Sequence, residues 1–136
     1  MNFEEQIRSN CGSLPYERIK ISELSQLELA TISKAIVFVF ATWSGTAVAS
    51  FRLLCEALAS SHLEKFPVIV LDADAFKPDV FKTVFGELPQ GKGEAFWIKQ
   101  GQVIFRDHGY TNKTSEILRT RINSLNLTPS HKTSLF

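Results

Sequence analysis

The sequence predicts an α/β domain in which a mixed β-sheet lies between layers of helices. Segments of strand and helix character alternate along the chain, which is typical of parallel strands joined by helical crossovers. The run 35–41 is continuously apolar and β-prone, and 67–72 is a second run of buried type that ends in Asp72, as expected of central strands covered on both faces. Two later strands, 95–98 and 103–105, are joined tightly through residues 99–102, which indicates an antiparallel hairpin.

The first third of the chain contains a lead-in, one strand and one short helical stretch before the first apolar run. Residues 1–16 mix polar and apolar types and contain Gly12 and Pro15, so we expect a flexible or loosely helical segment. Residues 18–21 alternate polar and apolar side chains, which predicts a half-buried strand. The stretch 22–32 carries leucine and isoleucine at helical spacing and predicts a short helix.

Three further helices are expected in the rest of the chain. The first spans residues 46–62 and its apolar face consists of Val48, Phe51, Cys55 and Leu58. The second begins with Pro78 in its first turn, and its inner side consists of Phe81, Val84, Phe85 and Leu88. The third spans residues 115–125. Residues 127–136 hold a proline and several serines and threonines, so we expect a flexible C-terminal tail.

The composition indicates one folded domain, residues 17–126, preceded by the lead-in and followed by the tail. The chain has 136 residues, of which 44% are hydrophobic and 21% charged, with a formal net charge of +1. This balance gives no electrostatic reason to expect binding of nucleic acid or of an anionic membrane. The longest apolar run is too short to span a bilayer, and the acidic N-terminus has no secretory signal. We therefore expect a cytoplasmic protein.

The segment that follows the first apolar strand, Phe40-Ala41-Thr42-Trp43-Ser44-Gly45-Thr46-Ala47, resembles the active-site turn of the thioredoxin family. Residues 70–74 are similar to the third strand of that family with its acidic end, and residues 98–103 to its closing hairpin. Gly109 resembles the glycine before the last helix. The resemblance covers about residues 17–125. It implies a thioredoxin-like three-layer α/β/α sandwich whose central mixed sheet is closed by an antiparallel hairpin.

The sequence departs from the family pattern where the family carries its chemistry. Ser44 and Ala47 occupy the positions of Cys-x-x-Cys, and neither residue can take part in thiol–disulfide exchange. Phe38 corresponds to the buried acid of the family and Val70 to the lysine paired with it. Gly93 corresponds, within a residue, to the cis-proline. The resemblance therefore implies a redox-inactive relative that needs no cofactor and has no thioredoxin-type reductase activity.

A retained fold with lost chemistry favours a protein-binding, accessory or chaperone-like module. In thioredoxins the surface around the active-site tryptophan receives an extended polypeptide, and the matching residues should meet at the carboxyl ends of the parallel strands. The predicted binding edge consists of Thr42, Trp43, Ser44, Asp74, Phe76, Lys92, Gly93 and Glu94. The expected partner is a protein of unknown identity. A homodimer is also open, because the chain has 11 Phe whose exposed surface a second copy would cover.

The alternative hypothesis is a thiol-dependent enzyme. Glutathione transferases, on a related fold, use a serine to stabilise a bound thiolate, and Ser44 at a helix N-terminus could activate a glutathione-like thiol in that way. Cys55 could instead act as a lone reactive thiol. The competing interpretation is structural: Ser44 and Thr46 would cap the helix, and Cys55 would be a small buried hydrophobe. Cys11 lies in the lead-in, where it could be exposed as an incidental thiol.

No metal or phosphate site is expected. His62, His108 and His131 are far apart in the sequence, and none has a second ligand at recognisable spacing. The Asp72-x-Asp74 pair is a common pattern at strand ends. The glycines around Lys92 lack the strand–loop–helix context of a phosphate loop.

Overall fold

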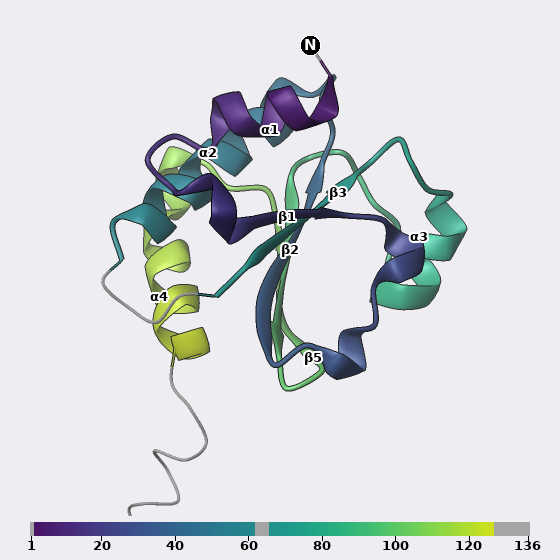
Figure 1. Cartoon of the computed structure of the whole chain (residues 1–136). Coiled ribbons are helices and arrows are strands. Elements are labelled where there is room, and N and C mark those ends of the chain that lie inside the picture. Colours follow the sequence, from purple (N-terminus) through teal and green to yellow (C-terminus); the bar gives the residue numbers. More distant parts are fainter. Residues whose placement is uncertain (1, 62–65, 127–136) are drawn as a thin grey trace, which may run out of the picture.

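The computed structural model describes residues 2–61 and 66–126, which form a five-stranded sheet between two layers of helices (Figure 1). The strand order is β1-β3-β2-β4-β5. The strands are β1 (Ile19–Ser22), β2 (Lys34–Phe40), β3 (Val68–Asp72), β4 (Glu94–Lys99) and β5 (Gln102–His108). Strands β1, β2 and β3 are parallel, whereas β4 and β5 are antiparallel neighbours. The mixed sheet and the closing hairpin predicted from the sequence are confirmed.

Four α-helices cover the sheet within the described residues. They are α1 (Phe3–Asn10), α2 (Gly45–Ala59), α3 (Pro78–Phe85) and α4 (Ser115–Asn126). Helices α1, α2 and α4 lie on one face of the sheet, and α3 lies on the other (Figure 1). The three-layer α/β/α sandwich predicted from the sequence is therefore confirmed.

Strand β2 explains why the first apolar run has no polar positions. Its side chains alternate between two separate cores: Phe38 and Phe40 pack beneath α2, whereas Val37 and Val39 pack beneath α3. All four are fully buried. A central strand covered on both faces has no solvent side on which a polar residue would be favoured.

The core beneath α3 is built largely of phenylalanine rings. The Phe81 ring stacks on Phe76 and Phe85 at centroid distances of 5.2 and 4.7 Å, and Phe96 from β4 packs 4.6 Å from Phe85. The helix ends after Phe85 because Gly86 adopts a left-handed conformation, with φ of 83°. Leu88, predicted to lie on the inner side of this helix, therefore lies beyond its end and is exposed.

Of the two alternatives for the lead-in, flexible or loosely helical, the structure has a helix: residues 3–10 form α1 and contribute to the main core. Asn2 caps the helix by accepting a hydrogen bond from the Glu5 amide at 2.8 Å. Ile7 is fully buried, and the Phe3 ring packs edge-on against Phe40 at a centroid distance of 5.9 Å. Leu14, just after the helix, is buried in the same core. These contacts attach the segment to the sheet.

The predicted helix over residues 22–32 is wrong. The segment forms two single 3₁₀ turns, Leu24–Gln26 and Leu29–Thr31. It is held instead by the hairpin turn, whose Gln100 and Gly101 amides donate to the Ser33 and Ile32 carbonyls at 2.6 and 2.8 Å. The backbone is extended at Leu27 and again at Ile32, directly after the two turns, so the helical conformation is interrupted. The predicted tail, residues 127–136, and His62 lie outside the described residues.

Candidate functional site

Helix α2 begins at the segment that resembles the thioredoxin active-site turn. Ser44 is the N-cap, and its Oγ accepts a hydrogen bond from the Ala47 amide at 3.2 Å. The Ala47 side chain is fully buried. The Ser44 oxygen therefore satisfies a helix-terminal amide, which agrees with the structural interpretation of Ser44 as a cap.

The positions that the resemblance assigns to a buried acid and its lysine are both apolar. Phe38 and Val70 are direct neighbours across β2 and β3, and both are fully buried. The Phe38 ring lies 5.1 Å from the Phe51 ring of α2. A phenyl ring thus occupies the core beneath α2 at the position of the family's acid, and no titratable group stands at either position.

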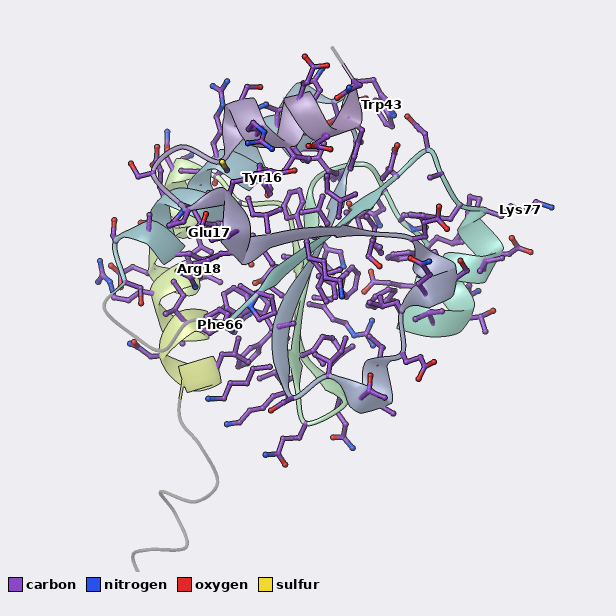
Figure 2. The ribbon with its side chains drawn as sticks, in the orientation of Figure 1. Tyr16, Glu17, Arg18, Trp43, Phe66 and Lys77 are labelled. Atoms are coloured by element: carbon purple, nitrogen blue, oxygen red, sulfur yellow. The ribbon has the colours of Figure 1, made fainter. Side chains whose placement is uncertain are left out.

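Trp43 is the most exposed large apolar side chain of the described residues, with 67% of its surface accessible. Figure 2 shows it at the periphery of the molecule, away from the packed centre. Its indole Nε1 donates to Asp74 Oδ1 at 3.1 Å, and the Asp74 amide donates to Asp72 Oδ1 at 2.9 Å. The indole is therefore exposed but oriented, since the carboxyl end of β3 holds its polar atom.

The other side of Trp43 meets the loop of residues 90–93, which precedes β4. A Cβ built on Gly91 would lie 2.7 Å from Trp43 Cη2, so only a glycine allows this approach. Glu94, the first residue of β4, is only 1% exposed. Its carboxylate accepts a hydrogen bond from the Gln90 amide and another, at 3.0 Å, from the Lys92 amide. The loop is thus folded around a buried carboxylate.

Ser50, on α2, connects this loop to the segment that follows β5. Its Oγ donates to the Gly93 carbonyl and accepts from the Tyr110 amide, both at 2.9 Å. A Cβ on Gly93 would lie 2.6 Å from Ser50 Cβ and 3.0 Å from Ala47 Cα. The position corresponding to the cis-proline of the family is therefore a glycine packed directly onto α2, and the described residues contain no cis peptide bond.

The structure brings only part of the predicted binding edge to the surface. Thr42, Trp43, Asp74 and Lys92 have solvent-accessible side chains. Gly93 and Glu94 are buried, so they are unavailable as the contact surface that the sequence predicted. Ser44 and Phe76 are partly buried: Ser44 caps α2, and the Phe76 ring stacks on Phe81. The surface named the Trp43 edge below consists of Thr42, Trp43, Asp74 and Lys92 from the predicted edge, together with Gly91.

A groove along α2 was missed by the sequence analysis. One hollow of about 830 Å³ begins at Thr42 and lies between α2 and the segment after β5. A second, of about 470 Å³, lies between α2 and α4 and shares Leu53, Glu56 and Thr111 with the first. The sequence holds one signal for it, because Ala49, Leu53 and Ala57 recur every four residues beside the predicted apolar face.

Neither cysteine lies at the surface. Cys55 is fully buried on α2, and burial, with Cys11 and Glu56 nearby, raises the pKa of its thiol well above the usual range. Cys11, expected as an exposable thiol, is buried too, and its Sγ lies 3.3 Å from the Arg8 carbonyl. The position of Cys55 on the inner face of α2 agrees with its interpretation as a small buried hydrophobe.

A separate polar cluster links the start of the loop after α3 to β5. The Glu87 carboxylate lies 3.2 Å from Arg106 Nη1 and 2.6 Å from His108 Nε2. Partial burial alone would raise the pKa of Glu87, but hydrogen bonds and charge from His108 and Arg106 outweigh it and lower that pKa. Among residues 2–61 and 66–126, no group of three or more His, Cys, Asp or Glu side chains is placed to hold a metal ion.

Comparisons with known proteins bear on the fold. No family model matches the sequence, and no curated protein matches it. Mitochondrial thioredoxin 3 from Saccharomyces cerevisiae, in its oxidized form, is similar with a TM-score of 0.60 and 19% identity, over 81% of this chain and 98% of that one. Reduced desulfothioredoxin from Desulfovibrio vulgaris Hildenborough is similar with a TM-score of 0.57 and 18% identity, over 78% and 95% of the two chains.

The chain has a thioredoxin-like fold. A third similar chain comes from a structural study of thiol resolution in the yeast mitochondrial 1-Cys peroxiredoxin via glutathione/thioredoxin systems, with a TM-score of 0.57 and 20% identity, over 77% and 95% of the chains. At such identities the similarity concerns the fold alone. In the part of the chain that the structure describes, no helix is both long and apolar enough to cross a membrane.

Proposed function

We propose that this chain is a protein-binding module, accessory or chaperone-like in kind, that keeps a thioredoxin-like fold without dithiol chemistry. One observation carries the proposal: at the start of α2, Ser44 caps the helix and Ala47 is buried where the family has its cysteines, while Trp43 beside them stays exposed. The chain therefore acts as a binding protein and not as an enzyme, and its place of action is the cytoplasm.

The surroundings of α2 support the absence of redox chemistry. A proton carrier beneath the helix start is replaced by Phe38, whose environment is wholly apolar. The nearest thiol on the same helix, Cys55, faces the core, and the raised pKa keeps it protonated at neutral pH, when only a thiolate is a strong nucleophile. The burial of Cys55 also counts against the alternative in which Cys55 acts as a lone reactive thiol.

The geometry of the Trp43 edge supports binding of a polypeptide. Tryptophan is enriched among the residues that dominate protein interfaces, where its large surface is buried against a partner. The hydrogen bond to Asp74 and the contact with Gly91 fix the indole in advance, so less conformational entropy is lost on binding. The groove that begins at Thr42 gives a partner chain further surface along α2.

The absence of dithiol chemistry is tested by insulin reduction with dithiothreitol, followed by turbidity. The wild-type chain should not increase the rate above that of dithiothreitol alone. The Ser44→Cys/Ala47→Cys double variant is the matched control, because it places two thiols at the helix start and should increase the rate. Acceleration by the wild type at catalytic concentration would contradict the proposal.

The binding role is tested by affinity capture from the native cell, comparing wild type with Trp43→Ala. Ile117→Ala is the matched control, because Ile117 is another exposed apolar residue, on α4. A partner retained by wild type and by the control but lost with Trp43→Ala is the expected result. Equal retention of the partner by all three chains would contradict a binding role for the Trp43 edge. Binding of glutathione to the wild-type chain, measured by calorimetry, would favour the thiol-dependent alternative.

A further inference from the structure

We infer that Glu94 is the positioning residue of the Trp43 edge: its buried carboxylate fixes the loop of residues 90–93 in the shape against which Trp43 rests. The inference depends on the proposed function for what the edge binds. The role of Glu94 in holding the loop, however, is a property of the chain without a partner and is tested on the free chain.

The burial of Glu94 is the first step. A carboxylate that is only 1% exposed needs donors close by, because an unpaired buried charge is costly. Glu94 obtains them from the amides of Gln90 and Lys92. Within the described residues neither amide donates to a backbone carbonyl, so the loop and the carboxylate satisfy each other. Hydrogen bonds to an ionised acceptor are about twice as strong as neutral ones.

The second step connects the carboxylate to the indole. Gly91 lies between the two bonded amides and adopts a φ of 71°, which places its backbone against the Trp43 ring. If the amides of Gln90 and Lys92 were released, Ser50 would still hold the Gly93 carbonyl, but the described loop would have no hydrogen bond on Gly91 or on the residues directly beside it. The indole would then be held by Asp74 alone.

The third step is the contrast with the family. A rigid cis-proline stands at this place in thioredoxins, whereas here Gly93 gives the backbone no rigidity of its own. Ser50 fixes the Gly93 carbonyl from below, and Glu94 fixes the two amides on the preceding residues. In this chain two side chains therefore give the loop the defined shape that a proline ring gives elsewhere.

The experiment is ¹H–¹⁵N NMR on the free full-length chain, comparing wild type with Glu94→Gln. Glutamine keeps the size of the side chain but has one acceptor oxygen instead of two. Its NH₂ group would face the backbone N–H of Gln90 or Lys92, and two donors cannot form a hydrogen bond with each other. We expect at least one of the Gln90 and Lys92 amides, the one that loses its acceptor, to exchange with D₂O at least about tenfold faster, as loss of a hydrogen bond to a charged group implies. We also expect the Trp43 indole N–H resonance to move.

Glu87→Gln is the matched control. Glu87 is a second carboxylate, partly buried and three residues before this loop in the sequence, but it binds the side chains of Arg106 and His108, not loop amides. It should leave the two amides and the indole resonance unchanged. A folded Glu94→Gln chain with wild-type exchange and an unmoved indole overturns the inference, as does an equal effect of the Glu87 variant.

Two further readouts keep the test decisive. If the Glu94→Gln chain does not fold, the hydrogen exchange rates of the wild-type amides test the inference instead. The inference requires the Gln90 and Lys92 amides to be protected from exchange although they lie in a loop. Unprotected amides would overturn it. Failure of the capture experiment leaves all these readouts unchanged, so it rejects the binding role alone. Conversely, a confirmed partner with unchanged loop amides rejects the role of Glu94 alone.

Discussion

The phenylalanine core beneath α3 and the loop beside Trp43 are held in contrasting ways. Beneath α3, Phe81 and its neighbours make stacked and edge-on ring contacts that bury a large apolar area. Beside Trp43, the buried groups of Ser50 and Glu94 make directional hydrogen bonds to loop backbone. Apolar burial is non-directional and supplies stability, whereas hydrogen bonds specify where a backbone lies. Stability and the shape of the edge therefore reside in different parts of the molecule.

The largest effect should come from removing a ring of the phenylalanine core. Phe81→Ala deletes a fully buried ring that contacts three others, and should lower the free energy of unfolding by about 3–5 kcal/mol. Urea denaturation measures the loss. The Trp43 indole resonance of the folded fraction should stay in place. The neighbouring exposed Val80→Ala is the control, and should stay within about 0.5 kcal/mol of wild type.

A smaller but more specific effect is expected at Ser50. Ser50→Ala leaves the Gly93 carbonyl and the Tyr110 amide without their buried partner, which should cost about 1–3 kcal/mol. Unlike the Phe81 variant, it should also move the amide resonances of residues 90–93 and 109–111. Thr46→Ala, an exposed change on the same helix, should do neither. Loss of stability without any movement of the loop resonances would show that Ser50 stabilises the fold without specifying the shape of the loop.

The smallest effect concerns the pH dependence given by Glu87. Its pKa in the folded chain is lower than the ordinary value, so its contribution to stability is present above the unfolded pKa and is lost as pH falls through the folded pKa. Glu87→Gln should therefore lower the melting temperature at pH values above about 5, and the difference should vanish in more acidic solution. Because the group is partly exposed, the effect should be under about 1 kcal/mol. A difference that is constant with pH would contradict this account.

The sheet could be predicted from the sequence because the apolar pattern of its strands indicates which residues are buried. A run such as 35–41 has no polar position, which together with its β-prone residues is typical of a strand covered on both faces. Trp43 and Ser44 were found because they belong to one contiguous segment. The turns over residues 22–32 were mistaken for a helix because apolar spacing does not reveal that a distant hairpin captures the backbone.

The inward placement of Glu94 could not be predicted from local pattern. A glutamate between glycine and an apolar strand is typical of a solvated loop, and the sequence analysis accordingly placed it on the contact surface. Its burial follows from the left-handed glycines on either side of Lys92, which turn the loop amides inward. Ser50 was likewise missed, because its two partners lie 43 and 60 residues away.

Those sequence separations also affect the order in which the contacts around Trp43 form. Contacts between residues distant in the chain form late, because loop closure must come before the contact is gained. Ser50 receives its second partner only when Tyr110 has been synthesised and β5 has paired with β4. A nascent chain that ends before β5 therefore carries Trp43 without the fully assembled surface around it. If the Trp43 edge binds a partner as proposed, only chains whose synthesis has passed the hairpin present the complete binding surface.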